Sequence, residues 1–265
     1  MMLDVNHVYK TFHPGTINER RALAGVDLHL EEGDFVTVIG GNGAGKSTLL
    51  NAVAGVWPVD GGSIVIDGND ITGLPDYKRA PFIGRVFQDP MMGTAPDMQL
   101  EENLALAYRR GKKLGLRWHI NREERDMYRD KLRELNLGLE DRLTTKVGLL
   151  SGGQRQAVTL LMASLQKPQL LLLDEHTAAL DPATAAKVLE LSDRIVQENG
   201  LTTMMITHNM KDAIRHGNRL IMMNKGEIIF DCRGEEKAKL TVEDLLEKFA
   251  QISGSTLDND RALLG

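Results

Sequence analysis

Glycines fill three of the five positions 41–45, and Lys46 and Ser47 follow them directly. Residues 40–47 read GGNGAGKS, which matches the pattern G-x-x-x-x-G-K-[ST]. A short β-branched run, FVTVIG at 35–40, precedes this loop, and a run typical of a helix follows it. Backbone amides converge on a phosphate only in conformations that glycine tolerates, and a helix start adds positive charge. The succession of strand, glycine loop and helix therefore predicts a phosphate-binding loop in an α/β protein.

The residues of this loop have distinct expected roles. Lys46 is expected to lie against the β- and γ-phosphates of a nucleotide, and the hydroxyl of Ser47 is expected to hold Mg²⁺. The alternative is a glycine-rich turn that binds nothing, and the strand before the loop and the helix after it argue against that. The expected nucleotide-binding set here is Gly41, Asn42, Gly43, Ala44, Gly45, Lys46, Ser47 and Thr48.

A second stretch, LLLLDEHT at 170–177, carries two adjacent carboxylates. Asp174 ends a fully apolar strand-like run, where a carboxylate that holds Mg²⁺ through water is expected. Glu175 follows directly and is expected to polarise an attacking water. Two carboxylates that merely close a strand are common, but the phosphate loop upstream favours the chemical interpretation.

Composition and charge narrow the class of protein. The 265 residues are 42% hydrophobic and 26% charged, and the formal net charge of −5 argues against a general nucleic-acid binder. The single cysteine, Cys232, excludes an internal disulfide framework and fits a reducing compartment. The first residues lack the apolar core of a signal peptide, and no apolar run approaches the ~18 residues of a membrane span. We therefore expect a cytoplasmic protein that reaches a membrane only through a partner.

The rest of the chain alternates strand-like and helix-like segments. Runs at 3–12 and 23–34 predict a small antiparallel sheet, and a charged, helix-favouring stretch at 101–137 predicts a helical insertion. The other expected elements are a strand closed by the turn Asp67-Gly68 within 61–72, strands at 82–90, 170–175 and 202–208, a helix near 154–166, a helix opened by Asp181-Pro182, two short strands within 219–231, and an amphipathic helix at 242–250. The apolar strands predict a buried parallel sheet as the core.

The stretch LLSGGQRQAVTLLMASL at 149–165 identifies the family that the chain resembles. Ser151, Gly152 and Gly153 precede a helix without a lysine of the phosphate-loop type, so they form a second helix start suited to anions. The sequence resembles the ATP-binding cassette (ABC) ATPases, whose signature LSGGQ stands here at 150–154. The resemblance runs from about Leu3 to the last strands. It implies ATP and Mg²⁺ as cofactors.

The resemblance implies roles for several further residues. Phe12 stands where the family places an aromatic residue that stacks on adenine, with Tyr9 as the nearby competitor and a purely structural aromatic as the alternative. Gln88 matches the glutamine that contacts Mg²⁺ or the attacking water. Asp181, in TAALDP, matches the loop that reaches across the dimer, and His208 matches the histidine that touches the γ-phosphate.

Together with the carboxylates, these residues complete the implied site. The implied catalytic set is Glu175, His208, Gln88 and Lys46, and the implied metal set is Ser47, Gln88 and Asp174. The sequence departs from many relatives at His176, where they have proline, and we expect no loss of activity from this.

The family also implies an architecture. The chain is expected to form one P-loop NTPase (RecA-like) domain over 1–265, with a parallel-sheet core, an N-terminal antiparallel β-subdomain and an inserted α-helical subdomain. The nucleotide-binding core is expected at 1–88 and 167–240, the helical and signature subdomain at 89–166, and a C-terminal helix and tail at 241–265. Two such domains pair head to tail, so that each ATP lies between one phosphate loop and Ser151, Gly152, Gly153 and Gln154 of the other copy.

Three kinds of ABC protein fit these motifs: a transporter subunit, a soluble ATPase that acts on ribosomes or DNA, and a non-hydrolysing regulatory module. A single phosphate loop, the short interval between Gln88 and Ser151, and the presence of Glu175 and His208 favour the transporter. The separate chain and the approach TTKVGLLSGGQ resemble bacterial importers. We expect a peripheral subunit at the cytoplasmic face of the membrane.

The partners and the substrate are also implied by the resemblance. Permease subunits are expected to dock just after Gln88, where Met91, Met92 and Met98 offer adaptable apolar contacts, although packing within the helical subdomain is the alternative. The family adds an extracytoplasmic substrate-binding protein. Stretches such as MGTAPDMQLEENLALAYRRG resemble a group of bacterial cassettes of which some members are linked to tryptophan or other aromatic amino acids.

Overall fold

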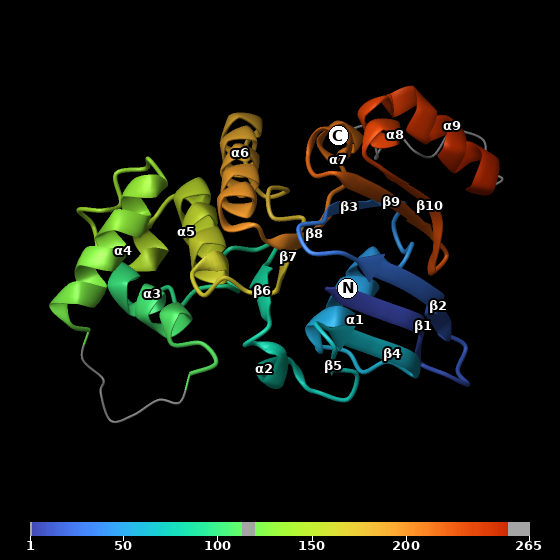
Figure 1. Ribbon diagram of the computed structural model, residues 1–265, viewed down its shortest axis with the longest axis horizontal. Coiled ribbons are helices and arrows are strands. Elements are labelled where there is room, and N and C mark those ends of the chain that lie inside the picture. The colour runs from blue at the N-terminus through green and yellow to red at the C-terminus, as the bar shows by residue number, and fades with distance from the viewer. Residues whose placement is uncertain (1, 113–119, 254–265) are drawn as a thin grey trace. The chain divides into compact units, whose positions relative to one another are not determined.

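The computed structural model describes residues 2–112 and 120–253 of the chain (Figure 1). It forms two compact units, Met1–Arg79 with Gly200–Gly265, and Ala80–Asn199. Helices and strands alternate along both units, which confirms the expected α/β class. None of the helices within these described ranges has the length and apolar character of a transmembrane span.

The first unit contains the predicted antiparallel sheet. Its strands lie in the order β2-β1-β4-β5, with β1 at Leu3–Phe12, β2 at Arg20–Leu30, β4 at Gly61–Ile66 and β5 at Asn69–Asp70. Leu3 of β1 stands opposite Leu30 of β2 and Ile66 of β4, and all three side chains are buried. The turn between β4 and β5 has positive φ angles at Asp67 and Gly68, as a two-residue hairpin of type I′ requires.

A second group of strands in this unit carries the phosphate loop. Its order is β10-β9-β3-β8, with β3 at Phe35–Ile39, β8 at Thr202–Ile206, β9 at Arg219–Asn224 and β10 at Glu227–Arg233. β3 runs parallel to β8 and β9, and every residue of β3 is buried, as expected of a central parallel strand. The helices are α1 (Lys46–Ala54), α2 (Asp76–Arg79), α7 (Met210–Arg215), α8 (Glu235–Ala238) and α9 (Val242–Ser253).

The C-terminal helix α9 belongs to this core, as its amphipathic pattern predicted. Leu245 and Phe249 of α9 pack in one cluster with Ile39 of β3, Met210 of α7 and Met222 of β9. Burial of large apolar side chains of this kind stabilises the fold by roughly 1.5–3 kcal/mol each. The helix therefore closes the apolar side of the strand that leads into the phosphate loop.

The second unit joins a short parallel sheet to the predicted helical insertion. β6 (Ile83–Val86) pairs in parallel with β7 (Leu170–Asp174), and Arg85 stands opposite Leu172. The helices are α3 (Leu100–Tyr108), α4 (Arg122–Glu134), the 3₁₀ turn η1 (Val147–Leu149), α5 (Gly152–Ser164) and α6 (Pro182–Asn199). A bidentate ion pair of Arg125 with Glu101 ties α4 to α3. So does Nη2 of Arg109, which donates to both carboxylate oxygens of Glu124.

The boundaries between the two compact units lie at 79/80 and 199/200, so β6, β7 and α6 belong to the same unit as the helical insertion. The expected functional subdivision at 88 and 166 is a different partition and stays a prediction.

Candidate functional site

The phosphate loop has the geometry that its glycines predicted. Gly40 follows β3 at φ 147°, and a Cβ atom there would collide with the carbonyl oxygen of Met223. Gly45 caps α1 at φ 108°, and a Cβ atom there would lie 2.6 Å from the carbonyl oxygen of Ala22. Only glycine fits such positions without strain. Because Gly45 has no side chain to cap the helix, the amides of the first turn of α1 are left to bind an anion.

Lys46 lies folded against its own loop. Its Nζ atom donates to the carbonyl oxygen of Gly40 at 2.7 Å and to that of Gly41 at 3.2 Å. The residue is 5% exposed, so the ammonium lies inside the loop. Ser47 and Asn42 are exposed, and Thr48 and Ala44 are buried beneath them. The loop therefore presents a positive charge lined by backbone, as a polyphosphate site requires.

An arginine that sequence analysis missed connects this loop to the expected adenine side. Phe12 stands opposite Arg20 in the ladder of β1 and β2. The Nη2 atom of Arg20 donates to the carbonyl oxygen of Gly43 at 2.8 Å. The Phe12 ring is half-buried and meets Trp57 edge-on, with centroids 5.0 Å apart. Phe12 is therefore paired with a residue that bonds to the loop, and its adenine-stacking role stays a prediction.

His208 comes from the strand next to the loop. Val38 of β3 pairs with Ile206 of β8, and the amide of Thr207 donates to the carbonyl oxygen of Val38 at 3.3 Å. Because the carboxyl ends of parallel strands meet at one edge, His208 and the phosphate loop leave the sheet at the same edge. Asn209 begins α7 and accepts from the amides of its first turn, which fixes the backbone next to the histidine.

In the second unit, Gln88 and the two carboxylates also share a sheet edge. Val86, the last residue of β6, pairs with Leu173; Gln88 lies two residues after Val86, and Asp174 is the last residue of β7. Gln88 is exposed, whereas Asp174 and Glu175 are half-buried. Glu175 has a φ of 46°, a conformation that is uncommon for a residue other than glycine. Six other described non-glycine residues also have a positive φ, so this conformation does not single out Glu175, and its catalytic role stays a prediction.

Arg85, which sequence analysis also missed, faces Asp174. Its Nη2 atom lies 3.2 Å from Oδ2 of Asp174, and the two side chains are 15% and 17% exposed. The guanidinium carbon lies 4.5 Å from the centre of the Phe87 ring. Burial lowers the pKa of Arg85, and the charge of Asp174 opposes that shift. The guanidinium stays charged, because its ordinary pKa lies far above neutrality.

The signature begins α5 as predicted. Ser151 is the N-cap: its hydroxyl accepts from the amide of Gln154, and the Gln154 side chain accepts from the amide of Ser151, both at 3.2 Å. Gly152 and Gly153 form the first turn, and a Cβ atom on Gly153 would collide with Thr184 of α6. The signature residues therefore present a capped helix start with a bare backbone, which is a surface that suits an anion.

Two neighbouring side chains brace the signature helix from within the same unit. Arg155 donates to the carbonyl oxygens of Val147, Gly148 and Leu150, which holds the approach to the signature in place. Gln156 donates to the carbonyl oxygen of Phe87 at 3.2 Å, so α5 also holds the segment that leads to Gln88.

Asp181 and His176 have local structural partners. Asp181 is exposed and accepts from the amide of Thr184 at 3.1 Å, and hydrogen bonds from the side chain and backbone of Thr184 lower its pKa. This caps α6 and sets the conformation of the loop before it. His176 is buried and its Nε2 atom lies 2.9 Å from the hydroxyl of Ser192. His176 is therefore a core residue that anchors the same loop to α6.

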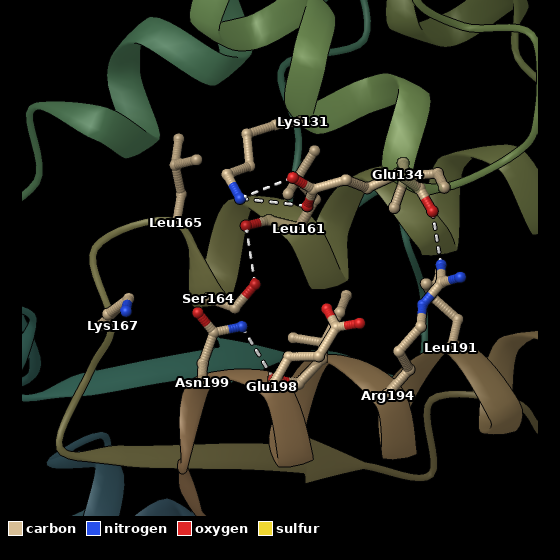
Figure 2. Close-up of a pocket in the computed structure, with 12 residues that line it drawn as sticks. Lys131, Glu134, Leu161, Ser164, Leu165, Lys167, Leu191, Arg194, Glu198 and Asn199 are labelled. Carbon is tan, nitrogen blue, oxygen red and sulfur yellow. Dashed lines mark hydrogen bonds and ion pairs between the residues drawn. The ribbon is translucent and has the colours of Figure 1, made fainter.

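Two hollows open among the helices of the second unit. The larger, of 570 Å³, lies beside α5 and α6, and Ser151, Gly153 and Gln154 help to line it. Figure 2 shows the smaller, of 230 Å³, between α4, α5 and α6, where Lys131 pairs with Glu134 at 2.8 Å. The larger hollow touches the predicted site, whereas no predicted site residue lines the smaller one.

Apolar side chains are exposed on the segments that flank the signature and Gln88. Met91 is 40% exposed, Met92 69% and Leu149 73%, whereas Met98 is half-buried. The Sδ atom of Met91 lies 2.7 Å from Nη1 of Arg155. The expectation that these methionines are available to a partner therefore fits Met91 and Met92 better than Met98.

The donors present suit Mg²⁺. Within the described ranges no group of three or more His, Cys, Asp or Glu side chains could hold a metal. A Mg²⁺ ion that arrives with a polyphosphate needs only one or two protein oxygens, because phosphates and water supply the rest. The predicted set of one hydroxyl, one amide and one carboxylate, from Ser47, Gln88 and Asp174, is made of such hard oxygen donors.

Comparisons with known proteins identify the family of the chain. Residues 23–178 match the family model described as "ABC transporter". The chain is 46% identical to a tyrosine transport ATP-binding protein of Clostridioides difficile, over 94% of this chain and 98% of that protein. It is 33% identical to a xylose/arabinose import ATP-binding protein of Sulfolobus acidocaldarius, over 94% and 95% of the two chains.

Solved structures give the same result for the fold. A dimeric bacterial ABC transporter cassette matches with a TM-score of 0.74 and 32% identity, over 88% of this chain and 98% of that chain. An ATP-binding cassette of an ABC transporter in its ADP conformation matches with a TM-score of 0.75 and 28% identity, over 96% and 99%. These matches confirm the expected cassette fold of the P-loop NTPase class.

Proposed function

The chain belongs to the ABC transporter family, and we propose that it is the ATPase that powers import of an amino acid through a membrane permease. The observation that carries the proposal is the 46% identity, over almost the whole chain, to a tyrosine transport ATP-binding protein. The geometries of the phosphate loop and the signature support nucleotide binding. The presence of Glu175, the carboxylate that would polarise water, supports hydrolysis of the bound ATP as well. A soluble ABC ATPase that is uncoupled from transport is the alternative.

We propose an aromatic amino acid as the substrate class. The support is the tyrosine transport relative, together with the resemblance to cassettes linked to aromatic amino acids. Relatives that are 30–34% identical have names that point to sugars, phosphonates and methionine, so the family resemblance alone does not fix the substrate.

The proposed roles divide between the two units of the chain. The loop at 41–48 binds the phosphates and Phe12 stacks on adenine, while Ser47, Gln88 and Asp174 hold Mg²⁺, which neutralises charge on the phosphates when bound. Glu175 orients and polarises the attacking water, and His208 contacts the γ-phosphate. The chemistry is in-line attack of water on phosphorus, so the protein contributes mainly position and charge.

The proposed assembly is a homodimer with two nucleotides between its subunits. Each subunit lends Ser151, Gly152, Gly153 and Gln154 to the ATP of the other, and Asp181 reaches across the dimer. Dimeric forms of related cassettes support this arrangement. Two helix starts suited to anions in one chain, at Lys46 and at Gly152, are explained if each serves a different ATP.

The proposed partners place the dimer at the cytoplasmic face of a membrane. Permease helices dock on Met91, Met92 and Leu149, whose exposed side chains can adapt to an apolar partner. An extracytoplasmic substrate-binding protein completes the importer.

Uptake by cells that lack this chain tests the proposal. We expect loss of tyrosine or tryptophan uptake, with xylose and methionine uptake unchanged, and restoration by the wild-type chain. Glu175→Gln should fail to restore uptake and should lower the ATPase rate about 10²- to 10⁴-fold, while ATP binding is kept. Glu198→Gln, an exposed change on α6, is the matched control and should behave as wild type. Unchanged uptake of all substrates would favour the uncoupled ATPase.

A further inference from the structure

Arg85 lies between the two segments that carry Gln88 and Asp174. It stands on β6, three residues before Gln88, and pairs with Asp174 at the end of β7. Its guanidinium also stacks on Phe87, the residue next to Gln88. One side chain therefore contacts the proposed carboxylate ligand of Mg²⁺ and the segment of the proposed amide ligand.

This placement is costly and specific. The side chain is 15% exposed, and its Nε atom is buried without a hydrogen-bond partner among the residues that the structure describes. Leaving a buried donor unpaired costs about 1–3 kcal/mol, so the packing of β6 would be better served by an apolar side chain. Two other residues of β6, Ile83 and Val86, have such buried apolar side chains. The cost indicates that Arg85 has a task other than packing.

We propose that Arg85 is a positioning residue that orients the carboxylate of Asp174 for the Mg²⁺ of bound ATP. The proposal rests on the proposed function, in which Asp174 holds Mg²⁺ through water. Carboxylates that serve a metal are held by hydrogen-bond partners in the surrounding shell, and loss of such a partner typically costs 10–100-fold in metal affinity. A carboxylate has about four lone-pair sites, so the ion pair through Oδ2 is compatible with acceptance from a metal-bound water.

The stack on Phe87 fixes the position of the guanidinium. Gln156 of α5 donates to the carbonyl oxygen of Phe87, so that residue is held from a second side. A guanidinium clamped in this way keeps its orientation when the carboxylate gains a second partner. In the alternative interpretation, the Arg85 guanidinium competes with Mg²⁺ for Asp174. Removal of Arg85 would then lower the Mg²⁺ concentration that nucleotide binding requires.

The test is a Mg²⁺ titration of the binding of a non-hydrolysable ATP analogue to the full chain, measured by calorimetry. For Arg85→Met we expect a midpoint Mg²⁺ concentration about 10–100-fold above that of wild type, with affinity in EDTA unchanged. Arg85→Lys keeps the charge but loses the planar guanidinium that stacks on Phe87, and should restore the midpoint only in part. Arg110→Met is the matched control, since Arg110 is another partly buried arginine of the second unit, bonded to the carbonyl oxygen of Ala163. It should leave the midpoint unchanged.

The results distinguish a failure of the role of Arg85 from a failure of the metal role of Asp174. An unchanged or lowered midpoint in Arg85→Met overturns the positioning role, and a lowered one identifies Arg85 as a competing cation. If wild type itself binds the analogue without any effect of Mg²⁺, the proposed metal role of Asp174 is wrong. Thermal unfolding of each variant reports folding, and Arg85→Gln, which keeps a donor at the site, provides the same test if Arg85→Met does not fold.

Discussion

The Nζ atom of Lys46 lies 2.7 Å from the carbonyl oxygen of Gly40, so the lysine of the phosphate loop bonds to the loop itself. A bound phosphate would offer this ammonium a charged acceptor in place of a neutral one, and hydrogen bonds to charged groups contribute about 1.5–3 kcal/mol. We therefore predict that Lys46→Ala raises the Kd for ATP about 10–100-fold, as measured by calorimetry or a fluorescent nucleotide. Lys78→Ala, on the exposed surface of the same unit, should have no effect. An unchanged Kd in Lys46→Ala would remove the phosphate-loop assignment.

Phe12 and Tyr9 are both aromatic residues of β1, and Phe12 pairs with Arg20, whose side chain bonds to the phosphate loop. Stacking of a base on an aromatic ring contributes about 1–3 kcal/mol. We predict that Phe12→Ala weakens ATP binding about tenfold, that Phe12→Trp restores it, and that Tyr9→Ala leaves it unchanged. Equilibrium binding of labelled ATP measures all three. The reverse pattern, a loss with Tyr9→Ala alone, would transfer the adenine contact to Tyr9.

A substitution of Ser151 can keep the helix cap and add a negative charge at the same position. Aspartate caps helices as well as serine does and favours the positive end of a helix, so Ser151→Asp should fold with unimpaired stability. The new carboxylate would face the phosphates of the partner's ATP and repel them. We predict that Ser151→Asp, in the Glu175→Gln background, binds ATP normally but loses the ATP-dependent dimer, as measured by light scattering after gel filtration.

The control for this variant is Asn121→Asp, which makes a neutral N-cap acidic at the start of α4. It should leave the ATP-dependent dimer intact. A Ser151→Asp chain that still dimerises with ATP would contradict the shared nucleotide site.

Local sequence was sufficient to predict the elements whose signals are local. The glycines of the phosphate loop, the cap at Ser151 and the apolar run of β7 are such signals, because turn geometry, capping and periodicity act between near neighbours. The arginines at positions 20, 79, 85 and 155 could not be assigned from sequence. Arg20 bonds to a carbonyl 23 positions away and Arg85 to a carboxylate 89 positions away. An isolated arginine in a strand or a helix looks the same in the sequence whether it meets solvent or a buried acceptor, so such contacts become visible only after the elements have packed together.

Arg79 holds the end of the phosphate-loop helix. It is 2% exposed and donates to the carbonyl oxygens of Ala52 and Val53 at the end of α1, and to those of Thr72 and Leu74. Arg79→Met would remove all four hydrogen bonds; the carbonyl of Ala52 keeps the amide of Gly55 as a donor, and each buried carbonyl left unpaired costs about 1–3 kcal/mol. We predict a loss of about 3 kcal/mol in the free energy of unfolding, measured with urea. Lys78→Met, one residue away and exposed, should change it little, and equal stability of the two variants would make Arg79 dispensable.

Cys232, the single cysteine, reports on the core of the first unit. It is 3% exposed in the cluster that holds Leu245 and Phe249, and burial raises the pKa of its thiol to about 11. The thiolate is the reactive species, so we predict that iodoacetamide leaves the native chain unmodified at pH 8 and modifies it fully in concentrated urea, as measured by mass spectrometry. Because the folded pKa lies above the unfolded value near 9, the protonated thiol stabilises the fold below that pH. The free energy of unfolding should therefore fall between pH 9 and pH 11, by at most about 1.4 kcal/mol per pH unit, and Cys232→Ala should lack this contribution. Rapid alkylation of the native chain at pH 8 would contradict the buried placement.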